Sequence, residues 1–219
     1  MRPALLALTL LSGCSTLGTL SGARPLDPGQ HALQAAISLQ HASEPLSLAT
    51  GLPLPQIELG YRHGLAPDLD WGARVYLFGT VADLRYRFAR LGRFDLATQP
   101  SLGLCILPIP AMGIGNVDLG LPLIAETDLG PHTSLVLAAR TVTREHFAWE
   151  VGTGSTGRFE LLAGGGVRVS RRFERVSLGG YGDVLVNTSR LGPLWWTGGV
   201  DLGIRLGRLE VEPDAPGPG

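Results

Sequence analysis

Alternation of polar and apolar residues is the feature of this sequence that most restricts the folds open to it. In QIELGYRH (56–63), Glu, Gly and Arg alternate with Ile, Leu and Tyr. A period of two places successive side chains on opposite faces of a β-strand, whereas glycines interrupt every window long enough for a helix. We therefore predict strands over 30–40, 56–63, 70–78, 81–88, 95–106, 116–126, 132–141, 145–152, 158–169, 174–186 and 195–207.

Short turn-forming stretches separate these segments, among them GLAPDLD, RLGRFD, TDLGPH, SRRFE and NTSRLGP. Strands joined in succession by short turns form an antiparallel up-and-down sheet, and closure into a barrel removes its unpaired edges. We expect a single all-β barrel over 30–207. Because single-chain bacterial barrels have even strand numbers, we expect about 10–12 strands, so one of the predicted segments must be wrong.

The composition of the polar face indicates which side of the sheet faces inward. Alternation itself fits a soluble barrel with an apolar interior and a membrane barrel with an apolar exterior. Here the polar face combines Gly with opposite charges two or four residues apart, as in Glu58/Arg62, Asp70/Arg74, Asp83/Arg85 and Asp201/Arg205. Small residues and Arg–carboxylate pairs suit a crowded lumen in which charges satisfy one another. The candidate lumen residues are Glu58, Arg62, Asp70, Arg74, Asp83, Arg85, Arg87, Arg158, Glu160, Arg168, Asp201 and Arg205.

Aromatic residues and strand length also favour the membrane arrangement. Tyr61, Trp71, Phe78, Trp195 and Trp196 fall near the ends of predicted strands, where an interfacial girdle belongs. Most predicted segments are eight to twelve residues long, and a tilted membrane strand needs about 9–11.

The stretch LPLPQIELGYRHGLAPDLDWGARVY (52–76) resembles the repeating hairpin of bacterial outer-membrane β-barrel proteins: a Pro-led strand, a Gly-Leu-x-x-x-Leu-Asp turn and a Gly-containing return strand. The resemblance is one of sequence style over residues 30–207, and it implies a transmembrane barrel. Such barrels usually end on an aromatic residue that the assembly machinery reads. Here the last predicted strand ends near Leu206 and a Pro-rich tail follows, so the sequence does not show how the barrel is assembled.

The N-terminus carries a second resemblance. Residues 3–12 form a short apolar run after Arg2, typical of a secretory signal and too short to cross a bilayer as a helix. Leu11-Ser12-Gly13-Cys14 resembles the lipobox of bacterial lipoproteins, which implies cleavage before Cys14, acyl chains such as palmitate on that residue, and export to the outer membrane. An ordinary signal peptide with an unrelated cysteine is the alternative.

These observations divide the chain into four parts. We predict a lipoprotein signal peptide at 1–13, a lipidated N-terminus and flexible tether at 14–29, the β-barrel at 30–207, and a disordered Pro/Gly-rich tail at 208–219.

Several classes of function are disfavoured. A net charge of −1 gives no electrostatic footprint for nucleic acid, and two cysteines cannot build a zinc ribbon. If Cys14 is lipidated, Cys105 has no disulfide partner within the chain. GTGSTG (152–157) matches a nucleotide-binding GxGxxG, but an alternating, strand-like stretch follows it where a helix is required, so we interpret it as a hairpin turn. We expect no metal and no cofactor.

The histidines offer no ready-made catalytic set. His132 and Ser134 share a strand face, as do His146 and Glu150. Residues two apart along a strand lie about 6.6 Å apart and residues four apart about 13 Å, so neither pair is a nucleophile–base contact. We expect the protein not to be an enzyme.

The leading hypothesis is a lipid-anchored barrel of the bacterial outer membrane that is structural or forms a narrow passive channel, with membrane lipid as its partner. One alternative is a soluble periplasmic lipoprotein with a lipocalin-like barrel that binds an apolar ligand. Another is a barrel enzyme that acts on lipids, either a hydrolase or an acyltransferase.

Overall fold

The computed structural model describes residues 20–42, 53–76, 78–109, 112–150, 154–188 and 194–207. In these residues no helix is long and apolar enough to cross a membrane. The described strands are β1 (His31–Ala42), β2 (Leu54–Ala66), β3 (Leu69–Tyr76), β4 (Gly79–Leu91), β5 (Phe94–Thr98), β6 (Ser101–Ile109), β7 (Met112–Gly130), β8 (Thr133–Glu150), β9 (Gly154–Phe173), β10 (Val176–Asn187) and β11 (Leu194–Leu206).

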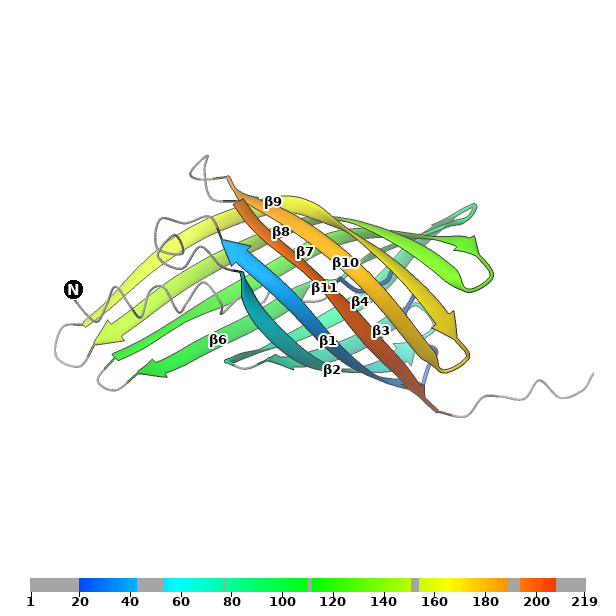
Figure 1. Cartoon of the computed structure of the whole chain (residues 1–219), viewed down its shortest axis with the longest axis horizontal. Helices are drawn as coiled ribbons and strands as arrows, with labels where there is room; N and C mark the ends of the chain where they lie inside the picture. The colour runs from blue at the N-terminus through cyan, green and yellow to red at the C-terminus, as the bar shows by residue number, and fades with distance from the viewer. Residues whose placement is uncertain are drawn as a thin grey trace, which may run out of the picture.

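The strands form a closed barrel. All the pairings between them are antiparallel, and β1 pairs with β11 from His31↔Leu206 to Ala42↔Trp195, which joins the two ends of the sheet. Because β5 and β6 pair with successive parts of the same neighbours, β4 and β7, they share one position. The described strands therefore make an up-and-down barrel of ten positions, and the expected fold class is confirmed. Figure 1 shows the strands side by side in the barrel wall.

The wrong segment assignment is the division between 132–141 and 145–152, because the structure has the single strand β8 there. Thr141 and Thr143 lie on the same face of β8 as Leu135 and Leu137, so the alternation of polar and apolar residues is interrupted between the two predicted segments. Their hydroxyls donate to carbonyl oxygens of β7, at 3.1 Å to Leu121 and 3.5 Å to Leu119. A hydroxyl satisfied in this way can face outward without ending the strand.

The apolar side of the barrel faces outward. Along β7, Leu119, Leu121 and Leu123 are more than half exposed, whereas Asp118 and Glu126 are buried. The same division is seen on β2, β3 and β4, where Ile57, Val75 and Leu84 are exposed and Glu58, Arg74 and Asp83 are buried. A soluble barrel has the opposite arrangement. The fold is that of a transmembrane β-barrel, and the lipocalin-like alternative is excluded.

The two ends of the barrel differ in their connections. At one end, which we call the turn end, four connections have two residues each, at 67–68, 92–93, 131–132 and 174–175. The first residue of β1 and the last of β11 lie at the same end, since His31 pairs with Leu206. At the opposite end, the loop end, the connections include the longer segments 43–53 and 188–193.

The outer aromatics lie toward both ends, with one exception among the predicted girdle residues. Tyr61 packs against Trp71 near the turn end, their ring centroids 5.6 Å apart. Phe78 is exposed near the loop end, where Trp196 lies beside His41. Trp195 is only 6% exposed and points into the barrel. The girdle prediction is wrong for Trp195, because two adjacent strand residues must face opposite sides.

Leu121→Arg should destabilise the barrel by about 2–4 kcal/mol, because Leu121 is outward-facing in the middle of β7 and the substitution puts a charge in hydrocarbon. Urea unfolding of the protein in lipid vesicles measures this cost. The matched control is Leu129→Arg at the turn end of the same strand, for which we expect about 0–1 kcal/mol. Equal costs at the two positions would contradict an apolar band centred on Leu121.

Candidate functional site

The barrel lumen is the candidate functional site, because the buried charged side chains gather there. Ion pairs join residues of different strands, and an apolar cluster fills part of the loop-end half. The segment before β1 also enters the lumen.

A cluster of ion pairs on β2, β3 and β4 is built around Asp70, whose side chain is fully buried. Arg62 donates to Asp70 Oδ1 through Nη2 at 2.5 Å and to Asp83 Oδ1 through Nη1 at 2.7 Å. Arg85 donates to the other oxygen of Asp70. Arg74 lies 3.5 Å from Asp83. Arg62 and Asp70 thus each have two partners of opposite charge in this cluster.

A bidentate pair joins β9 to β11. Arg168 donates through Nε and Nη2 to the two carboxylate oxygens of Asp201, at 3.0 and 2.7 Å. Gly179, on the strand between them, provides the room for this pair. A Cβ at that position would lie 2.6 Å from Asp201 Oδ1 and 2.8 Å from Arg168 Nη2.

Gly179→Val should therefore destabilise the protein by about 1–3 kcal/mol, the usual cost of overpacking. The matched control is Gly180→Val, one residue along the same strand. A Cβ at Gly180 points outward and would meet only the Gly199 carbonyl, at 3.9 Å, so we expect a change within about 0.5 kcal/mol. Unfolding in urea compares the two variants, and equal stability would show that the pair does not depend on this space.

Ion pairs and an apolar cluster occupy the loop-end half of the lumen. Arg144 donates to both oxygens of Asp118 at 2.8 Å and lies over the Trp195 ring, 4.9 Å from its centroid. Glu160 accepts from His146 Nε2 at 3.3 Å and pairs with Arg158. Apolar side chains pack beside these pairs, namely Val142, Leu162, Leu185 and Trp195.

Residues 20–30, which we call the inner segment, run inside the barrel. Leu20, Ala23 and Leu26 are at most 5% exposed, and Leu20 and Ala23 pack with Ile124, Val136 and Tyr181 on the wall. A flexible tether was predicted over 14–29, and the described part of it differs from that prediction. Its apolar side chains pack against wall residues and its backbone N–H groups donate to wall carboxylates, and these contacts hold it in one conformation.

Hydrogen bonds to the backbone fix the inner segment at several points. The Ala23 N–H donates to Glu126 Oε2 at 2.7 Å, and the Leu26 N–H donates to Asp70 Oδ2 at 2.9 Å. Arg85 Nη1 donates to the Gly22 carbonyl at 2.9 Å. A Cβ at Gly22 would lie 2.6 Å from Glu126 Oε2, so the approach requires glycine.

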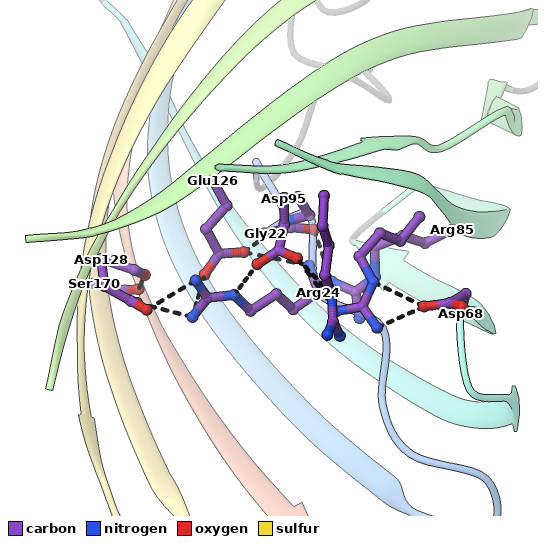
Figure 2. A network of polar contacts seen from close by, with 12 residues as sticks. Gly22, Arg24, Asp68, Arg85, Asp95, Glu126, Asp128 and Ser170 are labelled. Carbon is purple, nitrogen blue, oxygen red and sulfur yellow. Dashed lines mark hydrogen bonds and ion pairs between the residues drawn. The ribbon is translucent and has the colours of Figure 1, made fainter. Parts of the chain in front are cut away.

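Arg24 joins the inner segment to two wall strands, as Figure 2 shows. Its Nε donates to Asp95 on β5 at 2.6 Å, and its two terminal nitrogens donate to Asp128 on β7 at 2.8 and 2.9 Å. The hydrogen bond to Asp128 raises the pKa of the Arg24 guanidinium above its ordinary value. Arg24 thus stays charged.

The predicted lumen residues face the lumen, but the pairs proposed along single strands differ from those in the structure. Asp70 pairs with Arg62 and Arg85 on the neighbouring strands instead of with Arg74. Glu58 lies 3.7 Å from Arg74, and Asp201 binds Arg168. The reason is spacing, because residues four apart on one strand lie about 13 Å apart, whereas facing residues on adjacent strands lie about 5 Å apart.

Two arginines of the predicted set have other surroundings. Arg87 forms ion pairs with Asp68, in a two-residue turn, at 2.5 Å and with Asp95 at 3.4 Å. Arg205 faces the lumen at the turn end without an ion pair to any described residue. Cys14 lies outside the described residues.

Several charged residues of the lumen were not predicted. Asp118, Arg140, Arg144 and Asp183 have the same strand parity as their buried neighbours, so the alternation could have identified them. Arg24 has no such signal, because it precedes the first strand.

No catalytic or metal constellation is formed by the described part of the chain. His132 is exposed in the turn between β7 and β8, and Ser134 hydrogen-bonds to Ser170 at 2.9 Å. No group of three metal-ligating side chains occurs among these residues. Of GTGSTG (152–157), residues 154–157 belong to β9, so a strand follows the β8–β9 connection and no helix offers its N-terminus to a phosphate.

Known proteins resemble this chain in structure but not in sequence. No family model matches the sequence, and no curated protein matches it. The barrel of neisserial surface protein A is similar in structure, at 11% identity and a TM-score of 0.44 over 80% of this chain and 98% of that one. Ail of Yersinia pestis, in complex with a heparin analogue, is 12% identical, with a TM-score of 0.45 over 82% of this chain and 99% of that one. The translocator domain of the autotransporter NalP from Neisseria meningitidis is 10% identical, with a TM-score of 0.48 over 93% of this chain and 94% of that one. The likeness concerns the barrel fold alone.

Proposed function

We propose that this protein is a structural barrel of the bacterial outer membrane, lipid-anchored at Cys14, whose lumen is closed to solutes by its own N-terminal residues. The observation that best supports a closed lumen is the position of the inner segment inside the barrel, where it is hydrogen-bonded to three different parts of the wall.

The charges around the inner segment support a closed lumen over a narrow channel. Most lumen arginines are engaged by carboxylates, several of them in bidentate geometry. A pore that conducts ions keeps part of its lining free and hydrated, whereas paired charges and packed side chains leave little space. The electrical conductance of the purified protein in a planar lipid bilayer tests this proposal. We expect no discrete openings above the baseline, and steady openings would contradict it.

The two ends of the barrel support an orientation. In bacterial outer-membrane barrels the periplasmic turns are short and the extracellular loops are longer. Because the longer connections lie at the loop end, the proposal places the turn end, with the first and last barrel residues, on the periplasmic side. The proposal includes no enzymatic activity, and lipid release measured for His132→Ala and His146→Ala should equal that of the wild type.

Cys14→Ser should abolish incorporation of labelled palmitate while the protein still requires detergent for extraction. The first effect follows from loss of the acylated sulfur, and the second follows because the apolar band of the barrel remains in lipid. Labelling in cells followed by membrane fractionation measures both. Retained labelling would disprove the anchor without affecting the barrel, whereas release of the variant into buffer would disprove the integral barrel.

A further inference from the structure

A hollow of about 120 Å³ lies between the inner segment and the wall formed by β9, β10, β11 and β1, toward the turn end. About 10–15 Å³ measured in this way holds one water, so the hollow has room for several waters or for one phosphate group. Two features provide this space. Ser177 and Gly203 are paired across β10 and β11, and Ser177 has only a small side chain while Gly203 has none.

The hollow is strongly basic. Glu126 and Asp201 are the carboxylates among its lining residues, and six arginines line it, namely Arg24, Arg62, Arg85, Arg168, Arg172 and Arg205. Four of these arginines are neutralised by ion pairs with carboxylates of the wall. Both lining carboxylates are also engaged, because Glu126 accepts the Ala23 N–H and Asp201 accepts Arg168.

Arg172 and Arg205 differ from the other four arginines of the hollow, which form ion pairs. The guanidinium groups of these two arginines form no hydrogen bond or ion pair with any residue that the structure describes. They lie on the two strands that flank β10, since Ser177 pairs with Arg172 on one side and with Gly203, two residues before Arg205, on the other. Asp27 and Glu126 attract Arg205 only at longer range, while Arg172 repels it. Two like charges thus lie beside one cavity, and no described carboxylate forms an ion pair with either of them.

We propose that this hollow is a binding site for a phosphate group, held by Arg172 and Arg205. The planar guanidinium presents paired N–H donors that match phosphate oxygens, and a phosphate between the two arginines would neutralise their charge and satisfy their donors. The hydroxyls of Ser170 and Ser177 line the same hollow and are further donors. The phosphate could come from free inorganic phosphate or from the headgroup of an anionic phospholipid at that surface. The site does not depend on Cys14 or on a lumen closed to solutes.

The first arm of the test uses inorganic phosphate. The full-length protein in a neutral detergent is titrated with phosphate by calorimetry, at constant ionic strength set with chloride. We expect saturable binding that Arg172→Gln/Arg205→Gln weakens at least about tenfold, because a hydrogen bond to a charged group contributes about 1.5–3 kcal/mol. The control is Arg171→Gln/Arg175→Gln, two exposed arginines at the same end, which should leave binding unchanged. Urea midpoints show that each variant is folded.

The second arm tests the lipid source. The protein is extracted from phosphatidylcholine nanodiscs containing a minor fraction of phosphatidylglycerol, and retained phosphatidylglycerol is counted by native mass spectrometry. Retention by the wild type but not by Arg172→Gln/Arg205→Gln supports a lipid headgroup, whereas phosphate binding without lipid retention supports free phosphate. The proposal is overturned if neither ligand binds, or if the double variant binds both as well as the wild type does.

Discussion

Removal of residues 20–29 should convert a barrel that does not conduct ions into one with discrete openings in a planar bilayer. The variant keeps residues 1–19 and joins them to Gln30, so the predicted signal peptide and every described strand remain. The expected result follows from what the segment occupies. It packs Leu20 and Ala23 against the wall and engages Asp70, Asp95 and Glu126. Without it, these carboxylates line a hydrated passage and attract cations.

Smaller changes should separate loss of the segment from damage to the wall. Arg24→Ala removes the bonds to Asp95 and Asp128 but leaves the backbone of the segment in place, so we expect brief, intermittent openings. Asp27→Asn, whose side chain is exposed, should conduct no more than the wild type. A silent deletion variant that is folded by circular dichroism would show that the wall side chains alone close the lumen.

Asp70→Ala should lower the free energy of unfolding by about 3–5 kcal/mol, the cost of breaking a buried ion pair and leaving a charge uncompensated. Here Arg85 loses its ion-pair partner, and Arg62 loses one of its two carboxylate partners and keeps Asp83. The Leu26 N–H of the inner segment loses its acceptor as well. Urea unfolding in detergent micelles measures the change.

Asp68→Ala is the matched control for this prediction. Asp68 also pairs with an arginine, Arg87, but its side chain is 52% exposed, and exposed pairs contribute about 0–1 kcal/mol. Asp70→Ala/Arg85→Ala should recover part of the lost stability, because one uncompensated charge is removed together with its partner. Equal losses for Asp68→Ala and Asp70→Ala would contradict the central role assigned to the buried carboxylate.

The alternation in the sequence was sufficient to predict the barrel and most of its strands. A period of two is a local property, and it placed Glu58, Arg62 and Asp70 on the polar face, whereas the Gly and Arg–carboxylate content of that face predicted that it lines the lumen. It could not identify the partner of each charge. The partner depends on the register between neighbouring strands, and nothing within one strand encodes that register.

The inner segment could not be predicted for a related reason. Its sequence has the Gly, Pro and Ser content of a linker, and its order comes from contacts with residues about a hundred positions away, such as Ala23 with Glu126. The inward position of Trp195, in contrast, could have been predicted from the sequence. Val200 and Leu202 on the same strand face outward, so Trp196 shares their side and Trp195 faces inward.

The inner segment also constrains the order of events when the protein is made. The barrel closes where its first strand meets its last, between His31 and Leu206, and the last strand leaves the ribosome after all the others. If Cys14 is acylated as proposed, its acyl chains could not afterwards enter an interior crowded with paired side chains. The sheet would then close around a segment that is already in position, so that assembly of the barrel and closure of the lumen would be a single event.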